Sequence, residues 1–150
     1  MAAAPLALGA QFAPPKPAVQ FELRADVLSG PPAAGQLGVG VNVPAGSDVR
    51  LGIDAAGGAA VRDGAAFAIG RVDVAARYLL DPYGAFKWVP YVGGGLTAAW
   101  DRRGTRRADL LIMAGIEGPA KGGWRTAFEV GLGGGARLGV VLRRARSNGR

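Results

Sequence analysis

The residues of this chain that could do chemistry are carboxylates and guanidinium groups that recur at every second position. In the first such segment, Glu22, Arg24 and Asp26 are separated by single apolar residues. Paired carboxylates can act as general acid and base. Because these carboxylates alternate with arginine on one face, we expect permanent ion pairs instead. The expected ion-pair set is Glu22, Arg24, Asp26, Arg50, Asp54, Arg71, Asp73, Arg77, Asp101, Asp109, Glu117, Arg125, Glu129, Arg137 and Arg143.

Two residue types that most enzymes and metal sites use are absent from the 150 residues. The chain contains no His and no Cys. The sequence therefore lacks the usual general base, the commonest metal ligand and any thiolate ligand. We predict no catalytic residue, no cofactor and no metal site, and we expect that the protein is not an enzyme.

The charged residues lie on segments whose hydropathy alternates with a period of two. This alternation is typical of β-strands, and no 3.6-residue pattern competes with it. Gly, Pro, Asp and Ser separate the segments and suit tight turns. Short connections between eight strands predict an all-β, antiparallel, up-and-down sheet that closes into a barrel. The segments are 19–27, 36–43, 49–55, 71–80, 88–101, 108–117, 124–132 and 137–143.

The distribution of charge indicates which face of this barrel is inside. None of the 11 acidic residues falls on the apolar face, and the three that leave the polar face, Asp48, Asp63 and Asp81, lie in turns. The arginines on the polar face nearly balance the acids there. An enclosed surface must pair its charges, and Gly and Ala between the long side chains allow them to pack in a narrow lumen. We therefore predict a polar, charged interior and an apolar exterior.

The aromatic residues favour a membrane around this exterior. Trp88 and Trp100 share the apolar face of one segment. In a tilted strand their separation along the membrane normal is roughly 28 Å, close to the height of the apolar band between two aromatic girdles. Trp124 and Tyr78 are expected at the level of Trp88. These four side chains are our predicted membrane-interface aromatics, and the barrel is predicted to be transmembrane.

One run of residues adds a resemblance to a known family. The run 89–96, VPYVGGGL, resembles the PYVGGG strand of small outer-membrane barrels, and the pattern over 19–143 is similar to the outer membrane protein A/X type. The resemblance implies a Gram-negative outer membrane, periplasmic termini, a monomer and insertion by the barrel-assembly machinery. Members usually end on an aromatic residue, whereas this chain continues as a basic tail over 144–150. Residues 1–18 are interpreted as a signal-like or disordered Pro-rich leader.

Four arginines cluster between the fifth and sixth segments, in a turn that the resemblance places outside the cell. Arginine pairs well with phosphate, so this turn could bind lipopolysaccharide phosphates, or it could be a solvated turn with no ligand. Nucleic acid is not expected, because no aromatic stacking residues alternate with the charges. The cluster comprises Arg102, Arg103, Arg106 and Arg107.

Three functions remain open at this point. The first is a non-enzymatic outer-membrane barrel with a structural or surface-interaction role, in contact with outer-membrane lipid. The second is a soluble, lipocalin-like barrel that carries a small apolar ligand, which requires the apolar face to lie inside. The third is a narrow pore, which requires a lumen that side chains do not fill.

Overall fold

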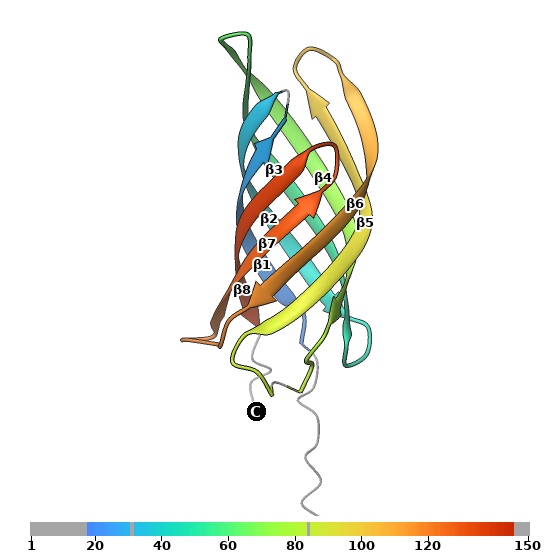
Figure 1. Ribbon diagram of the computed structural model, residues 1–150, viewed down its shortest axis with the longest axis vertical. Helices are drawn as coiled ribbons and strands as arrows, with labels where there is room; N and C mark the ends of the chain where they lie inside the picture. The colour runs from blue at the N-terminus through green and yellow to red at the C-terminus, as the bar shows by residue number, and fades with distance from the viewer. Residues whose placement is uncertain (1–17, 31, 84, 146–150) are drawn as a thin grey trace, which may run out of the picture.

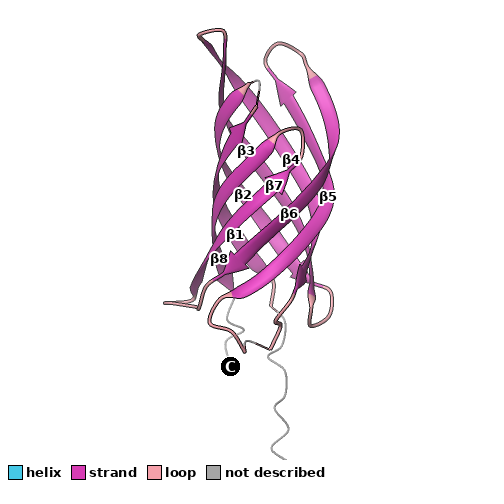
Figure 2. Cartoon of the chain, in the orientation of Figure 1, coloured by secondary structure: helices cyan, strands magenta, loops and turns pink. Residues whose placement is uncertain are grey.

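The computed structural model describes residues 18–30, 32–83 and 85–145, and they form one closed β-barrel (Figures 1 and 2). Each strand pairs antiparallel with the next along the chain, and β1 pairs with β8 to close the sheet. The predicted eight-stranded, all-antiparallel, up-and-down barrel is confirmed. The strands are β1 (Gln20–Ser29), β2 (Ala33–Pro44), β3 (Val49–Arg62), β4 (Ala65–Leu79), β5 (Val89–Asp101), β6 (Arg106–Glu117), β7 (Trp124–Leu132) and β8 (Ala136–Ala145).

The hairpin of β3 and β4 is longer than the sequence predicts. The predicted strands covered 49–55 and 71–80, whereas the ladder continues to Arg62↔Ala65. The intervening residues are mostly Ala and Gly, which have no hydropathy contrast between the two faces and so hide the period of two. Asp63 and Gly64 close the hairpin with positive φ angles of 52° and 76°, as a two-residue turn of type I′ requires.

The barrel wall is paired unevenly around its circumference. The ladder between β6 and β7 has six residue pairs, from Ile112↔Leu132 to Glu117↔Ala127, whereas the closing ladder between β1 and β8 has ten. The reason is that the β7–β8 hairpin is short, so the rim of the barrel is lower on this side (Figure 1). Residues 106–111 of β6 have no described β7 partner.

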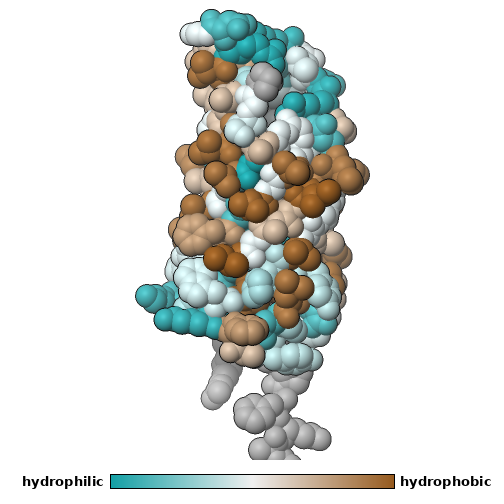
Figure 3. All heavy atoms as spheres, in the orientation of Figure 1, coloured by the Kyte–Doolittle hydropathy of each residue, from teal (hydrophilic) through white to brown (hydrophobic). Residues whose placement is uncertain are grey.

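The apolar side chains face outward around the whole wall. Leu37 and Leu96 expose 72% and 63% of their surface, while Arg77 and Arg143 expose only 1% each. In the space-filling view, apolar residues gather over the middle of the barrel, with hydrophilic residues at its upper end (Figure 3). This is the reverse of a soluble barrel, in which the apolar face is enclosed.

The lumen contains apolar groups as well as charges, which the sequence interpretation understated. One apolar cluster lies near the end of the barrel where β1 begins, one lies at the opposite end, and a small one lies between them. Alternation had placed Tyr91, Leu111 and Met113 on the inward face, and they are buried there. The clusters comprise Leu79, Tyr91, Ala127 and Val141; Leu28, Ala34 and Ala60; and Ala75, Leu111 and Met113.

The predicted leader and tail lie almost entirely outside the described residues. Of the leader over 1–18, only residue 18 is described, and residues 146–150 of the tail are not. Arg144 and Ala145, which the sequence assigned to the tail, continue β8 and pair with β1. In the described ranges, no helix is long and apolar enough to cross a bilayer.

Candidate functional site

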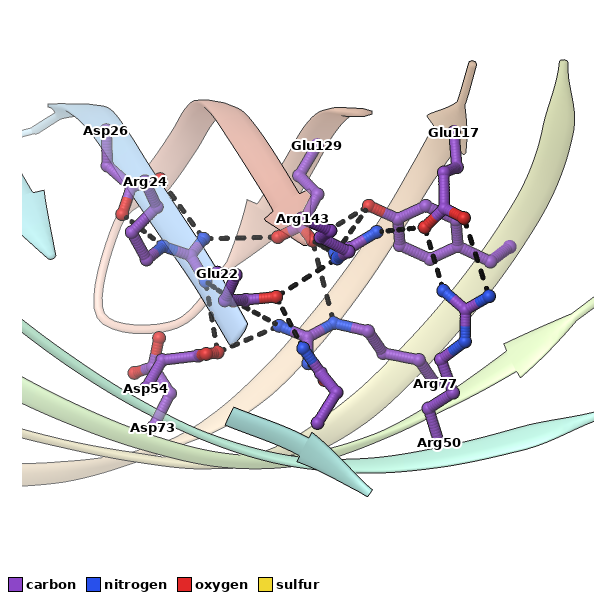
Figure 4. Close-up of polar contacts among 12 residues, drawn as sticks. Glu22, Arg24, Asp26, Arg50, Asp54, Asp73, Arg77, Glu117, Glu129 and Arg143 are labelled. Carbon is purple, nitrogen blue, oxygen red and sulfur yellow. Dashed lines mark hydrogen bonds and ion pairs between the residues drawn. The ribbon is translucent and has the colours of Figure 1, made fainter. Parts of the chain in front are cut away.

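Arg143 lies at the centre of the charged interior and contacts three carboxylates (Figure 4). Its Nε donates to Glu22 Oε2 at 3.0 Å, its Nη1 donates to Glu117 Oε2 at 2.9 Å, and its Nη2 donates to Glu129 Oε1 at 2.5 Å. The same Nη2 donates to the Tyr91 hydroxyl at 3.2 Å. Five strands, β1, β5, β6, β7 and β8, are therefore tied together through one guanidinium group.

Arg24 repeats this arrangement further along the lumen. Its Nε and Nη2 form a fork on Asp26 at 2.8 and 3.1 Å. Two further contacts of Arg24 cross the barrel. Its Nη1 donates to Asp54 at 3.0 Å, and its Nη2 donates to Glu129 at 3.1 Å. Arg77 also donates to Asp54, at 2.8 Å. Such forked, charge-assisted hydrogen bonds need the planar geometry of arginine.

The two ends of the network are simpler. One end of the barrel carries the β1–β2, β3–β4, β5–β6 and β7–β8 turns, and we call it the outer end. Toward this end, Arg71 bridges Asp26 at 2.5 Å and Asp73 at 3.2 Å, and Arg137 donates to Asp73 at 2.6 Å. This end of the network rests on β1, β4 and β8.

Toward the end where β1 begins, Glu117 accepts from Arg50 at 2.8 Å and from Arg125 at 3.1 Å. The side chains of Arg50 and Arg125 are 17% and 36% exposed, so the pairing becomes solvent-facing at this end of the barrel.

The network therefore offers no free acid or base. Six acids are buried in it, and each lies within 3.0 Å of at least one guanidinium nitrogen: Glu22, Asp26, Asp54, Asp73, Glu117 and Glu129. Chemically, the arrangement can bind strands to one another and block the lumen.

Two residues of the predicted ion-pair set lie outside this network. Asp101 closes the β5–β6 turn, where its Oδ1 accepts from the backbone N–H groups of Arg103 and Thr105 at 2.9 Å each. Asp109 pairs with Arg107 at 3.3 Å near the outer rim, and both side chains are about a third exposed or more. Both residues stand at positions of the alternation that face the lumen. Their strands extend to the rim, however, and at the rim such positions no longer point into a filled lumen.

Two uncharged residues that the sequence interpretation left out, Asn42 and Tyr91, take part in the network. Asn42 donates to Glu22 at 2.6 Å and accepts from Arg77 at 2.6 Å, and the Tyr91 hydroxyl donates to Glu129 at 2.8 Å. Both residues stand at polar-face positions of their alternating segments. Their position in the alternation was therefore the signal that could have identified them.

Glycine creates the space that the long side chains occupy. Gly40 faces the lumen opposite Asp54, and a Cβ atom added there would meet the Asp54 carboxylate and, at 2.9 Å, the Cγ of Glu22. The predicted role of small residues between the charges therefore has a concrete instance at this position.

The predicted interface aromatics lie at the two ends of the wall. Trp88, Trp124 and Tyr78 stand at the end of the barrel where β1 begins, and Trp100 stands at the outer end of β5. The rings of Trp88 and Phe128 are 6.1 Å apart between centroids, so they form one aromatic patch. The exposed fractions of Trp88 and Trp100 are 40% and 47%.

The arginine cluster of the sequence forms the β5–β6 turn and the first residues of β6. Arg102 and Arg106 are exposed, and the Arg103 guanidinium lies 4.5 Å from the centroid of the Phe67 ring. Arg107 Nη2 donates to the Gly134 carbonyl at 2.7 Å, which ties the turn to the β7–β8 hairpin.

No group of His, Cys, Asp and Glu residues that could hold a metal ion is present in the part of the chain that the structure describes. The chain matches no family model, and no curated protein resembles it in sequence.

Solved structures do resemble the chain. The N-terminal β-barrel domain of Pseudomonas aeruginosa OprF aligns over 84% of this chain and 96% of its own, with a TM-score of 0.58 and 18% identity. Neisserial surface protein A aligns over 85% of this chain and 95% of its own, with a TM-score of 0.59 and 14% identity. This chain has the fold of the small outer-membrane β-barrels. The de novo designed barrel TMB2.3 shares that fold, with a TM-score of 0.55 at 12% identity over 87% of this chain and 95% of its own.

Proposed function

We propose that this protein is a non-enzymatic β-barrel of a bacterial outer membrane, with a structural and surface-interaction role. The observation that carries the proposal is the inverted polarity of the wall, with paired arginines enclosed and large apolar side chains outside. In water such an exterior would aggregate, whereas in a bilayer the closed barrel satisfies its backbone hydrogen bonds internally. A monomer inserted by the barrel-assembly machinery is consistent with this proposal.

The surface-interaction part of the proposal concerns the arginine-rich outer turn. Four arginines stand there against two carboxylates, Asp101 and Asp109, and the Asp101 carboxylate already accepts the turn's own N–H groups. The excess positive charge and the forked donors suit lipid phosphate groups. We therefore propose that the turn binds lipopolysaccharide phosphates at the outer surface.

A matched pair of variants tests the turn. The refolded chain is titrated with vesicles that contain lipopolysaccharide, and the Arg102→Gln, Arg103→Gln, Arg106→Gln variant is compared with Lys87→Gln, Lys121→Gln, Arg144→Gln. Both variants lose three charges, but the second loses them at the opposite end of the barrel. We expect roughly tenfold weaker binding for the first variant alone, since each exposed ion pair contributes at most about 1 kcal/mol. Equal weakening by both variants, or equal binding to dephosphorylated lipopolysaccharide, would refute the phosphate contact.

The two other candidate functions lack the features they require. A lipocalin-like carrier needs its apolar face inside, whereas the buried faces of β1 and β4 hold Glu22, Arg24, Asp73 and Arg77. A pore needs an open lumen, whereas Arg77 and Arg143 fill the middle of this lumen together with their carboxylates.

The membrane proposal has a test of its own. We expect heat-modifiable gel mobility and extraction only by detergent, and a chain that is monomeric in plain buffer would contradict the membrane proposal.

A further inference from the structure

The lumen ends in a chamber just below the outer hairpins. Its volume is about 90 Å³, and its lining includes Leu28, Gln36, Phe67, Ile69, Arg71 and Arg107. Along β4, Phe67 lies nearest the outer end, Ile69 comes next, and Arg71 lies deepest in the lumen. On β1 and β2, the pair Leu28↔Ala34 is likewise nearer the outer end than the pair Asp26↔Gln36. The chamber thus has an apolar wall of Leu28, Phe67 and Ile69 and a polar floor, and its lining also includes the charged residues Arg62, Asp101 and Arg107.

Both residues of the floor have an unused hydrogen-bonding atom. Gln36 and Arg71 expose only 4% and 3% of their surface, and Gln36 Oε1 and Arg71 Nη1 have no hydrogen-bond partner within the described residues. One atom is an acceptor and the other is a donor. A buried polar atom without a partner is costly, so a molecule that supplies both a donor and an acceptor here gains affinity.

The guanidinium group of the floor is already paired with carboxylates. Arg71 is shared between Asp26 at 2.5 Å and Asp73 at 3.2 Å, and at the rim Arg107 pairs with Asp109 at 3.3 Å. A ligand with a net charge would therefore add a charge that the already paired Arg71 does not compensate, in a partly enclosed site. A carboxylate or an ammonium group is disfavoured, and an uncharged hydroxyl or primary amide is favoured.

We propose that this chamber binds a small uncharged amphiphile, with a hydroxyl or primary amide head on Gln36 and Arg71 and an apolar body of about four to six carbons against Leu28, Phe67 and Ile69. The size follows from the volume, because at about 10–15 Å³ for each water-sized group the chamber has room for roughly six to nine non-hydrogen atoms. The apolar part of the wall favours a hydrocarbon body, because water against Leu28, Phe67 and Ile69 finds no hydrogen-bond partner on those side chains. This binding site differs from the phosphate contact proposed for the outer turn, although Arg107 belongs both to the chamber lining and to the arginine cluster.

Methyl NMR of the full chain refolded in detergent micelles tests the proposal, with butyramide as the probe and butyrate as its charged counterpart. We expect saturable shifts of the Leu28 and Ile69 methyl signals, and no saturable shift at Ile112, which faces the membrane. Ile69→Trp, which fills the chamber, should abolish the shifts, whereas Ile53→Trp on the outer wall should not. Gln36→Leu removes the acceptor at similar volume and should weaken binding roughly fivefold.

Three results would overturn the proposal. Shifts that never saturate mean that the chamber holds only water. Shifts that persist in Ile69→Trp place the probe elsewhere on the protein or in the micelle. Butyrate that binds as tightly as butyramide contradicts the uncharged head, because the already paired guanidinium group of the floor should make it at least about tenfold weaker.

Discussion

Replacing Arg143 by methionine removes the guanidinium group that joins three buried carboxylates and keeps an unbranched apolar stem. Four hydrogen bonds are lost, to Glu22, Glu117, Glu129 and the Tyr91 hydroxyl. Breaking a buried ion pair from one side typically costs about 3–5 kcal/mol, because the partner charge is left uncompensated.

The remaining contacts reduce that cost for each carboxylate. Glu117 keeps Arg50 at 2.8 Å, Glu129 keeps Arg24 at 3.1 Å, and Glu22 keeps the Asn42 amide at 2.6 Å. No carboxylate is stranded completely, so we expect a loss near the lower limit, about 3 kcal/mol in the free energy of unfolding. The assay is urea unfolding in lipid vesicles, followed by tryptophan fluorescence.

The neighbouring residue provides a matched control. Arg144 carries the same charge on the same strand but points outward, with its guanidinium 5.5 Å from the Trp124 ring centroid. Arg144→Met should lower the free energy of unfolding by no more than about 1 kcal/mol, the value of an exposed cation–π contact. If Arg143→Met costs no more than this control, the interior network does not stabilise the barrel and our reasoning about it is refuted.

The remaining predictions concern other parts of the wall. Gly40→Ala should destabilise the barrel by about 1–3 kcal/mol through overpacking, whereas Gly35→Ala, with open space around its Cβ position, should change stability by less than about 0.5 kcal/mol in the same assay. In single-tryptophan variants, Trp88 and Trp100 should both be quenched more by lipids brominated near the headgroup than near the chain end; preferential quenching of either one at the bilayer centre would contradict the two girdles. Within 106–111, the amides that point away from β5 should exchange with deuterium faster than the other amides of β6, because no described β7 residue pairs with this segment; uniform exchange would argue against the short ladder.

The assignment of faces could be predicted from the sequence because side chains alternate strictly along a strand. Glu22, Arg24 and Asp26 are buried, and the apolar residues between them face outward, as the alternation requires. Closure of the barrel and its strand order also followed, since short turns leave few other ways to protect the sheet edges. These features depend only on local periodicity and turn chemistry.

The partners within the lumen could not be predicted, because they depend on the register between strands and on the width of the barrel. Nothing local indicates that Arg24 reaches Asp54 on β3 and Glu129 on β7. Asp101 was assigned to the interior for a related reason, since alternation does not indicate where the filled lumen ends. The small residues of 56–70 likewise concealed the upper half of the β3–β4 hairpin.

The interior and the two ends of this barrel therefore have different roles. The six acids buried in the network are all bound to arginine, so no solute can pass the middle of the lumen without breaking several ion pairs. Recognition requires groups whose hydrogen bonds or charges are not already used. The groups to which we assign recognition lie at the outer end, in the arginine-rich turn and in the chamber floored by Gln36 and Arg71. A barrel held rigid by its core can thus vary its outer hairpins, and with them its ligands, without losing its fold.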